Sequence, residues 1–391
     1  MTMYRQIWLL AAIRAIRMFM ITMPIIVLYW QSHGLLLRDI FILQVVYSIS
    51  IVLFELPSGY FADRFGHRLS LILGSMAGAI GFFTYWAFPS YAGFLVAEVV
   101  LALSAGFMSG ARDALLYDTL EHFKADALYT KWQGRLMAIG NASEAVAAVA
   151  AGIVASLSSI ATVLLVQWIV MIAAIPCAFA LTNVPAKANA IQKSLREIVR
   201  FSLRENKRLR FLTLYAGGLS ASTLTMVWFI QPHWEMLGVN ILYFGYLWAG
   251  LNLIVGLGSL MAHKVETWLR FRTLFGIMAI APLVLYGLTA YFSATLLVLM
   301  VTPLFWLLRG VSNPLIQDYV QRECAAGERA TVLSINALAT RLIFSIFSPF
   351  LGWIGDIWGL QTAFLASGLV FGVITIAAFA YLLTVWRPVR V

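Results

Sequence analysis

The chain has 391 residues, of which 62% are hydrophobic and only 11% are charged. A soluble protein of this length could not remove so much apolar surface from water, whereas a lipid bilayer accommodates it. The apolar runs are long and continuous rather than alternating over about ten residues, which excludes a transmembrane β-barrel. The composition therefore predicts an all-α membrane protein.

Twelve apolar stretches are long enough to cross a bilayer, because one helical span needs about 20 mostly apolar residues. The first stretch is too long for the apolar core of a signal peptide and carries Arg14 and Arg17, so we expect it to be retained as a membrane helix. In chain order, the predicted spans are 7–31, 38–62, 69–88, 92–120, 131–157, 159–182, 208–235, 241–262, 272–291, 294–321, 328–354 and 360–386.

The net charge of +10 is spread unevenly along the chain. Most Lys and Arg residues lie at the two ends and in the loops that follow even-numbered spans, whereas the alternate loops carry only Arg38. This positive-inside pattern predicts cytoplasmic N- and C-termini in a plasma membrane, here the inner membrane of a bacterium. The basic charge is explained by topology, with anionic membrane lipid as its partner, and we expect no nucleic-acid partner.

The longest polar segment divides the chain into six spans before it and six after it. We predict an N-terminal six-helix bundle in 1–182, a cytoplasmic linker in 183–207 and a C-terminal six-helix bundle in 208–391. Within the linker, apolar residues at helical spacing predict an amphipathic helix on the membrane surface, with a solvated basic linker as the alternative.

The two halves repeat several landmarks at a spacing of about 200 residues. Each pair falls at the same place in equivalent spans, as expected after gene duplication, and the repetition predicts two pseudo-symmetric bundles. The pairs are Gly59 with Gly258, Gly110 with Gly310, Asp118 with Asp318, and Gly152 with Gly352.

Residues 59–68 read GYFADRFGHR and form the polar loop between the second and third spans. This segment resembles the signature loop of the major facilitator superfamily, motif A, which follows the pattern G-x-x-x-D-R-x-G-x-[RK]. The runs ELPSGYFADR at 55–64 and SGARDALLYD at 109–118 also look like those of drug:proton antiporter-like members. The resemblance implies the major facilitator fold, with twelve transmembrane helices in two bundles, and transport by alternating access.

The resemblance also implies that this loop gates the transport cycle. A carboxylate at Asp63 can meet a helix N-terminus or a basic side chain, Gly59 permits close helix approach, and Gly66 permits a tight turn. Two positions depart from the family pattern: His67 replaces a basic residue, and Ala102 replaces an arginine of many proton-coupled exporters. The predicted gating residues are Gly59, Asp63, Arg64, Gly66, Arg68 and Asp118, and the residues expected to form ion pairs in this region are Arg64, Arg68 and Asp118.

Ionisable side chains inside the spans are candidates for proton coupling, because a charge in lipid costs about 2.5–3.5 kcal/mol on insertion scales. Glu144 is the only ionisable group in the run NASEAVAAVAAG, so it is the first candidate proton carrier, with Arg17 as an expected nearby charge. The resemblance implies that the first, fourth, seventh and tenth spans line a central cavity, and Glu98 on the fourth span is the second candidate.

A group of interior charges lies one to two helical turns from the cytoplasmic ends of the predicted spans. Arg14, Glu55, Arg112 and Asp113 fall at this depth. They predict an ion-pair cluster with either a structural or a gating role, and Asp113 is also a proton-coupling candidate.

The second half of the chain carries interior arginines without an interior acid, and the planar fork of an arginine suits a carboxylate or a phosphate. Aromatic and amide side chains on the cavity spans fit an amphipathic organic molecule, although many such aromatics serve packing or the membrane interface. The candidate substrate-binding residues are Arg17, Arg309, Arg341, Trp228, Gln231, Asn252, Trp306 and Asn313.

The sequence contains no P-loop, metal-ligand spacing or nucleophile elbow, so we expect no enzymatic activity, no cofactor and no metal. We predict a secondary active transporter, acting as a monomer, that uses a proton gradient to export small amphipathic organic molecules. The alternatives are an importer or facilitator of an organic anion, a lysophospholipid transporter, and a membrane receptor without transport.

Overall fold

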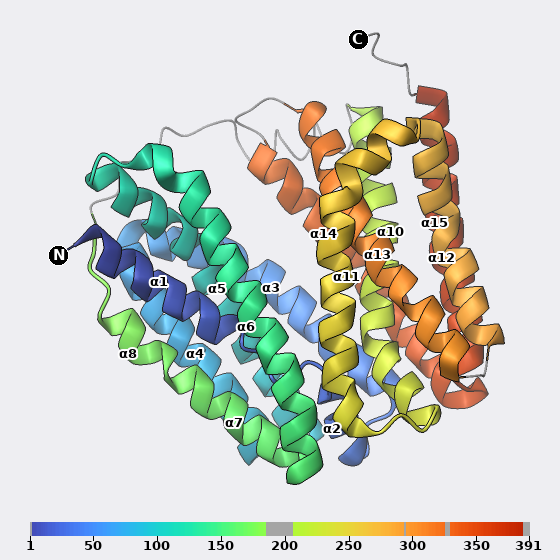
Figure 1. Cartoon of the computed structure of the whole chain (residues 1–391), viewed down its shortest axis with the longest axis horizontal. Coiled ribbons are helices and arrows are strands. Elements are labelled where there is room, and N and C mark those ends of the chain that lie inside the picture. The colour runs from blue at the N-terminus through green and yellow to red at the C-terminus, as the bar shows by residue number, and fades with distance from the viewer. Residues whose placement is uncertain (1, 185–205, 293–294, 325–328, 386–391) are drawn as a thin grey trace. The chain divides into compact units, whose positions relative to one another are not determined.

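The computed structural model describes residues 2–184, 206–292, 295–324 and 329–385. Every regular element in this part of the chain is a helix, and eleven helical segments are long and apolar enough to cross a membrane. The amphipathic helix predicted in the linker lies outside the described residues. In chain order, the helices of Figure 1 are α1 (Met3–Met18), α2 (Ile26–Ser32), α3 (Leu37–Phe65), α4 (His67–Ala87), α5 (Tyr91–His122), the 3-10 helix η1 (Asp126–Leu128), α6 (Tyr129–Leu157), α7 (Ile160–Ile172), α8 (Ala174–Phe179), α10 (Lys207–Met236), α11 (Ile241–Trp268), α12 (Phe271–Tyr291), α13 (Thr295–Arg322), α14 (Arg329–Trp358) and α15 (Leu360–Val385).

The first predicted span, 7–31, is not one continuous helix. α1 ends at Met18 and α2 begins at Ile26, with turns between them. Pro24 keeps the segment before α2 from joining α1, because proline has no N–H to continue the helical hydrogen bonds and disfavours helical backbone at the preceding residue. Neither piece alone is long enough to cross a membrane, so the described residues contain eleven spanning helices where twelve continuous spans were predicted.

The chain folds into two compact units. The first unit comprises Met1–Leu35, Leu43–Asn189 and Val239–Ala249, and the second comprises Leu36–Ile42, Ala190–Gly238 and Gly250–Val391. Each unit therefore contains the first turns of a helix whose remainder belongs to the other: α11 begins in the first unit, and α3 begins in the second.

Small residues allow α4 and α5 to pack closely in the first unit. A Cβ atom on Gly74 of α4 would lie 2.4 Å from Met108 Cγ of α5. At the same contact, the Ser104 hydroxyl donates to the Gly74 carbonyl over 2.6 Å. Membrane helices approach this closely when small residues line their contact, and α4 also packs against α7 and α8.

Glycines also explain why the start of α11 belongs to the first unit. A Cβ atom on Gly152 of α6 would lie 2.3 Å from the Leu242 carbonyl oxygen. A Cβ atom on Gly245 of α11 would lie 2.0 Å from the Ala148 carbonyl oxygen. Backbone atoms cannot retreat as the end of a flexible side chain can, so this crossing of α6 and α11 requires glycine at both positions.

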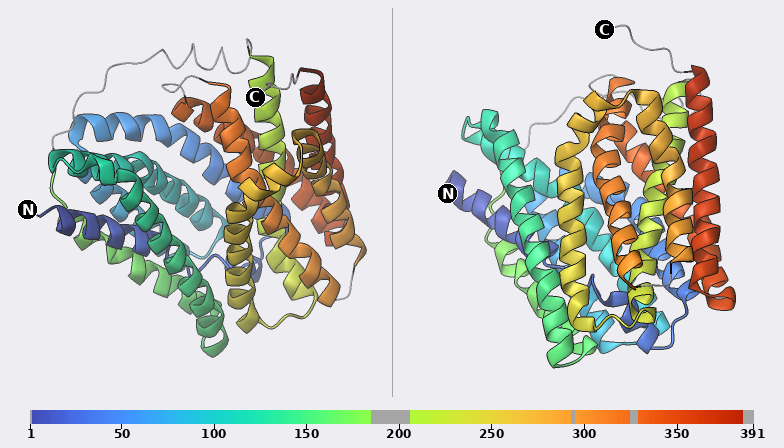
Figure 2. Two further views of the ribbon diagram at one scale, coloured as in Figure 1. Left: turned by 45° about the horizontal axis from the view of Figure 1, so that its top comes forward. Right: turned by 45° about the vertical axis from the view of Figure 1, so that its right-hand side comes forward.

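In the second unit, α12 and α15 lie side by side (Figure 2). A Cβ atom on Gly372 of α15 would lie 2.9 Å from Leu283 Cβ of α12, and the Thr375 hydroxyl donates to the Ala279 carbonyl over 2.6 Å. α10 packs against α13, α14 and α15, and most of its side chains are buried. The candidate substrate-binding residues on α10 therefore lie on the central helix of this unit.

Candidate functional site

The connection between α3 and α4 is a tight turn built on Gly66. Its φ of +95° is one that residues with a Cβ rarely adopt, and its N–H donates to the Ala62 carbonyl over 2.9 Å. α3 ends at Phe65 and α4 begins at His67, so this single residue makes the whole connection. The tight turn predicted at Gly66 is therefore present.

The described residues do not bring together the ion pairs expected around Asp63. Asp63 is exposed near the end of α3 and, in the described part of the chain, forms no hydrogen bond or ion pair. Arg64 Nη1 donates to the Tyr60 hydroxyl over 3.1 Å, and Arg68 Nη2 donates to the Phe179 carbonyl over 2.8 Å. Both arginines therefore have other partners in this structure, and their pairing with Asp63 stays a prediction.

Asp118, the acid expected to form an ion pair in this region, lies beside His67. Asp118 Oδ2 is 3.4 Å from His67 Nε2, and both side chains are about 10% exposed. The contact follows from the packing of α4 against α5, which brings the first residue of α4 to the last turns of α5. His67, which departs from the basic residue of motif A, thus occupies a position that contacts an acid.

Gly59 does not mediate a close helix contact inside its own unit. A Cβ atom on Gly59 would meet no described atom within 4 Å. The close approach of α3 and α5 lies at Gly106, where a Cβ atom would be 3.1 Å from Ser58 Oγ and 3.3 Å from Phe54 Cβ. The close approach of α3 and α5 within this unit therefore lies at Gly106, and the approach expected at Gly59 stays a prediction.

A buried polar network surrounds Glu98 in the first unit. Glu98 Oε1 accepts hydrogen bonds from Gln44 Nε2 over 2.9 Å and from the Tyr85 hydroxyl over 2.6 Å. All three side chains are buried. The Tyr29 hydroxyl donates to the Tyr85 carbonyl over 3.1 Å, so residues of α2, α3, α4 and α5 hold the network together. Both donors to the carboxyl group are neutral, so binding or losing a proton changes the net charge of this network.

Glu144, the first candidate proton carrier, has different surroundings. It is half-buried on α6 and interacts electrostatically with Arg14 of α1. Arg14 packs on Gly140 of α6, where a Cβ atom would lie 2.7 Å from Arg14 Nε. Arg17, which was expected to supply the charge beside Glu144, donates to the Ser104 carbonyl over 3.5 Å. Arg14 is therefore a cation that the structure places in the field of Glu144.

Asp113 belongs to an ion-pair cluster at one end of α5. Its Oδ1 lies 2.8 Å from Nη2 of the neighbouring Arg112. Arg14 interacts electrostatically with both residues and with Glu144, whereas Glu55 is exposed on α3. The cluster predicted from depth along the spans therefore forms around Arg14, Arg112 and Asp113, with Glu144 rather than Glu55 as its further acid.

The substrate-binding candidates other than Arg17 all lie in the second unit. Trp228 and Gln231 of α10 and Trp306 of α13 are buried there and contribute to helix packing. A transported molecule needs side chains that it can reach, and the half-buried candidates meet this requirement better. These are Asn252 of α11, Arg309 and Asn313 of α13, and Arg341 of α14.

The sequence did not single out Gln44 and Tyr85, the donors to Glu98. It also did not single out Asp356, whose carboxylate accepts hydrogen bonds from the first turn of α3. Gln44 is a single amide within the apolar run FILQVV. A buried amide needs a hydrogen-bond partner, so this pattern could have predicted a polar contact at Gln44. Tyr85 is one of 15 tyrosines and Asp356 lies near a helix end, so neither has a sequence signal that separates it from similar residues.

Comparison with known proteins then identifies the family. The family model for the Major Facilitator Superfamily matches residues 7–348, which is most of the chain. The chain belongs to the major facilitator superfamily. The comparison with curated proteins found no match.

Solved structures of this superfamily are similar to the chain over nearly its whole length. A mutant of the nucleoside transporter NupG has a TM-score of 0.82 at 14% identity, covering 99% of this chain and 100% of that chain. A bacterial homolog of the human lysosomal transporter Spinster has a TM-score of 0.75 at 14% identity, covering 98% and 99%. A D-xylose–proton symporter has a TM-score of 0.71 at 11% identity, covering 97% and 96%.

These likenesses confirm the predicted fold class, an all-α membrane protein with the major facilitator fold. Membership of the superfamily makes the protein an integral membrane protein and a transporter. The three similar structures are described as acting on different molecules, and at 11–14% identity they show the fold alone. Substrate, direction and coupling therefore have to be argued from the residues of this chain.

Proposed function

We propose that the protein is a secondary transporter that exports small amphipathic organic molecules in exchange for protons. The observation that carries the coupling is the buried Glu98 carboxyl group, held by the neutral donors Gln44 and Tyr85. Export is supported by the resemblance of 55–64 and 109–118 to drug:proton antiporter-like members. The energy source is an ion gradient, and no cofactor is needed.

The surroundings of Glu98 favour it over Glu144 as the proton site. An ionisable group buried in a membrane protein is by default a functional candidate. Glu144 interacts electrostatically with Arg14, so a cation already stands near its carboxylate. The donors to Glu98 carry no charge. The other titratable groups that the described residues place around this network are Tyr29, Tyr47 and Tyr85, together with His33, whose Nδ1 lies 2.8 Å from the Tyr29 carbonyl oxygen and not at the Glu98 carboxyl group. Proton exchange at Glu98 is therefore the larger electrostatic change, and we assign coupling to it.

Proteoliposomes that contain the purified protein test this assignment. An imposed pH gradient is applied, with ethidium as a cationic probe and fluorescein as an anionic probe. We expect Glu98→Gln to abolish gradient-driven accumulation of a transported probe but to spare exchange of labelled for unlabelled probe, because exchange needs no net proton movement. The matched control, Glu144→Gln, should retain gradient-driven accumulation.

The outcomes separate three cases. Continued pH-driven accumulation by Glu98→Gln would exclude Glu98 as the proton site. Loss of accumulation in Glu144→Gln alone would return the assignment to Glu144. A saturable flux through the wild-type protein that is the same with and without the pH gradient would exclude proton coupling.

A second candidate function is uptake or facilitated movement of an organic anion. Arg341 favours it, because this half-buried side chain on α14 forms no hydrogen bond or ion pair with any described residue. The guanidinium fork binds a carboxylate in two places, whereas a lysine supplies only a point charge. Arg341→Gln should therefore weaken binding of an anionic probe more than Arg341→Lys does. Equal, normal binding by both variants would remove this candidate.

We also propose that the protein acts as a monomer in the bacterial inner membrane with both termini in the cytoplasm, as the distribution of Lys and Arg indicates. In intact cells, a membrane-impermeant maleimide should then fail to label Lys207→Cys at the start of α10. It should label Pro89→Cys, an exposed position between α4 and α5, in the same background lacking Cys177 and Cys324. The reverse pattern would invert the orientation.

A further inference from the structure

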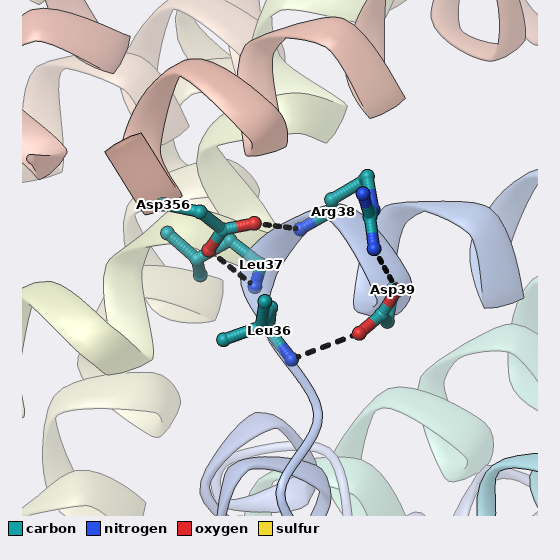
Figure 3. Close-up of polar contacts among 5 residues, drawn as sticks. All are labelled: Leu36, Leu37, Arg38, Asp39 and Asp356. Atoms are coloured by element: carbon teal, nitrogen blue, oxygen red, sulfur yellow. Dashed lines mark hydrogen bonds and ion pairs between the residues drawn. The ribbon is translucent and has the colours of Figure 1, made fainter. Parts of the chain in front are cut away.

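The start of α3 is bound by a carboxylate from a distant helix. The first N–H groups of any helix have no partner within the helix. Here the Leu37 N–H donates to Asp356 Oδ1 over 2.8 Å, and the Arg38 N–H donates to Asp356 Oδ2 over 2.9 Å. Figure 3 shows both oxygens of this single side chain facing the first turn of α3. Asp356 lies near the end of α14, so the contact joins residues far apart in the sequence.

A second acid at the same place acts only locally. Asp39 Oδ2 accepts from the Leu36 N–H over 3.2 Å, and Asp39 Oδ1 lies 3.4 Å from Arg38 Nη2 (Figure 3). Asp39 belongs to the first turn of α3 itself, so it stabilises the helix start without connecting it to another helix. The chain thus offers two carboxylates at one helix N-terminus, of which only Asp356 comes from α14.

The surface of α14 is shaped to receive this helix start. A Cβ atom on Gly352 would lie 2.7 Å from Phe41 Cδ2 and 2.9 Å from Arg38 Cα. Phe41 itself packs between Phe229 of α10 and Phe344 of α14, with ring centroids 4.9 Å and 6.0 Å away. The hydrogen bonds of Asp356 are therefore part of a close-packed contact rather than an isolated surface pair.

Among the described residues, no carboxylate caps the related crossing in the first unit. There, α11 begins against Gly152 of α6, and its start is capped by its own loop, since the Leu242 N–H donates to Asn240 Oδ1 over 2.9 Å. Ser156 stands where the repeat places Asp356, and its hydroxyl donates to the Ile153 carbonyl in the same helix. Both crossings are close-packed against a glycine, whereas the contact through a carboxylate occurs where α3 meets α14.

We propose that Asp356 is a latch residue, whose bonds to the Leu37 and Arg38 N–H groups hold the α3–α14 contact closed and must break when this end of the transporter opens. A carboxylate at a helix N-terminus is stabilised by the helix dipole and by direct hydrogen bonds, and it releases without chemical change. Its affinity is modest, so it biases an equilibrium without locking it. The inference uses alternating access, but it is independent of substrate and coupling ion.

Spin labels at Leu36→Cys and Ile357→Cys test the latch, in the full chain lacking Cys177 and Cys324. Both positions are more than half exposed, so the labels leave the packing intact. Dipolar broadening of the EPR spectrum then reports how much of the protein has the contact closed. We expect Asp356→Asn to raise the ratio of open to closed protein about tenfold. The matched control, Asp39→Asn, removes a carboxylate from the same helix start and should leave the ratio nearly unchanged.

A steric variant protects the test against a folding artefact. Gly352→Ala adds a methyl group against the Arg38 backbone and should open the contact as Asp356→Asn does. Gly250→Ala on α11, where a Cβ atom meets no described atom within 4 Å, is its control. If Asp356→Asn lowers thermal stability but leaves the spectrum at the wild-type ratio, or if Asp39→Asn opens the contact equally, Asp356 is not a latch.

Discussion

In the second unit, Gly258 of α11 and Gly310 of α13 bring two helix backbones into contact. A Cβ atom on Gly310 would lie 2.4 Å from the Val255 carbonyl oxygen. In the first unit, the corresponding Gly59 of α3 and Gly110 of α5 would each tolerate a Cβ atom with no described atom within 4 Å. Related positions of the repeat are thus close-packed in one unit and open in the other. A repeated glycine therefore does not by itself predict a repeated contact.

Buried tyrosines show a second difference between the units. Tyr85 of α4 and Tyr286 of α12 stand about 200 residues apart and are both buried. The Tyr85 hydroxyl donates to the carboxyl group of Glu98, whereas the Tyr286 hydroxyl donates over 2.7 Å to the backbone carbonyl of Ser222. Around Tyr286 the neighbours are aromatic, with the Phe305 ring centroid 4.8 Å away. The same side chain serves a titratable group in one unit and packing in the other.

The glycine comparison gives the largest predicted effect. Gly310→Ala places a methyl group against backbone and should destabilise the protein by about 1–3 kcal/mol, the usual range for overpacking. Gly110→Ala should change stability by less than about 0.5 kcal/mol, as is usual for substitutions away from packed features. Thermal unfolding in detergent, followed by tryptophan fluorescence, measures both. Equal losses in the two variants would show that the units do not differ at this contact.

The tyrosine comparison predicts a smaller effect on stability and a qualitative difference in function. Tyr85→Phe and Tyr286→Phe each remove one buried hydrogen bond, which is worth about 1 kcal/mol. Only Tyr85→Phe removes a donor from Glu98, so only this variant should change the pH profile of transport in proteoliposomes. A shifted pH profile in Tyr286→Phe, or an unchanged one in Tyr85→Phe, would contradict the assignment of proton coupling to Glu98.

The sequence was sufficient to predict the fold class and the one site feature that depends on local backbone geometry, the turn at Gly66. Apolar runs predicted the spanning helices to within a few residues, because lipid requires long helical segments. The turn at Gly66 was predictable because it depends only on the backbone φ angle of this one residue, which glycine adopts readily. Pro24 was also visible in the sequence, but counting apolar residues over 7–31 gave no weight to it.

Side-chain partners were much harder to predict, because they depend on which helix faces touch. Motif A suggested partners for Asp63 by proximity in the sequence, yet Arg68 binds the carbonyl of Phe179, which is distant along the chain. Glu98 was recognisable as an interior acid, but its donors on α3 and α4 were not. The position of a residue along a span gives its depth in the membrane. It does not say which neighbouring helix the side chain faces. It therefore could not separate Arg14 from Arg17 as the neighbour of Glu144.

The smallest predicted difference concerns the acids that the repeat pairs near the ends of α5 and α13. Asp118 is 11% exposed beside His67, whereas Asp318 is 47% exposed beside Arg322, four residues along the same helix. Asp118→Asn should cost about 1 kcal/mol, since it alters a nearly buried contact between two helices. Asp318→Asn should cost no more than about 0.5 kcal/mol, because exposed pairs within one helix are worth little.

Salt separates these two contributions more sharply than the difference in stability does. Exposed charges are screened by added salt, whereas nearly buried ones are screened much less. The effect of Asp318→Asn on thermal unfolding should therefore vanish at high ionic strength, while that of Asp118→Asn persists. Arg322 also has Glu266 within 3.7 Å, so it keeps a partner after Asp318 is changed, which further reduces the expected loss. If the effect of Asp118→Asn also vanished with salt, the His67 contact would be a surface pair, and the two units would use this pair of acids in the same way.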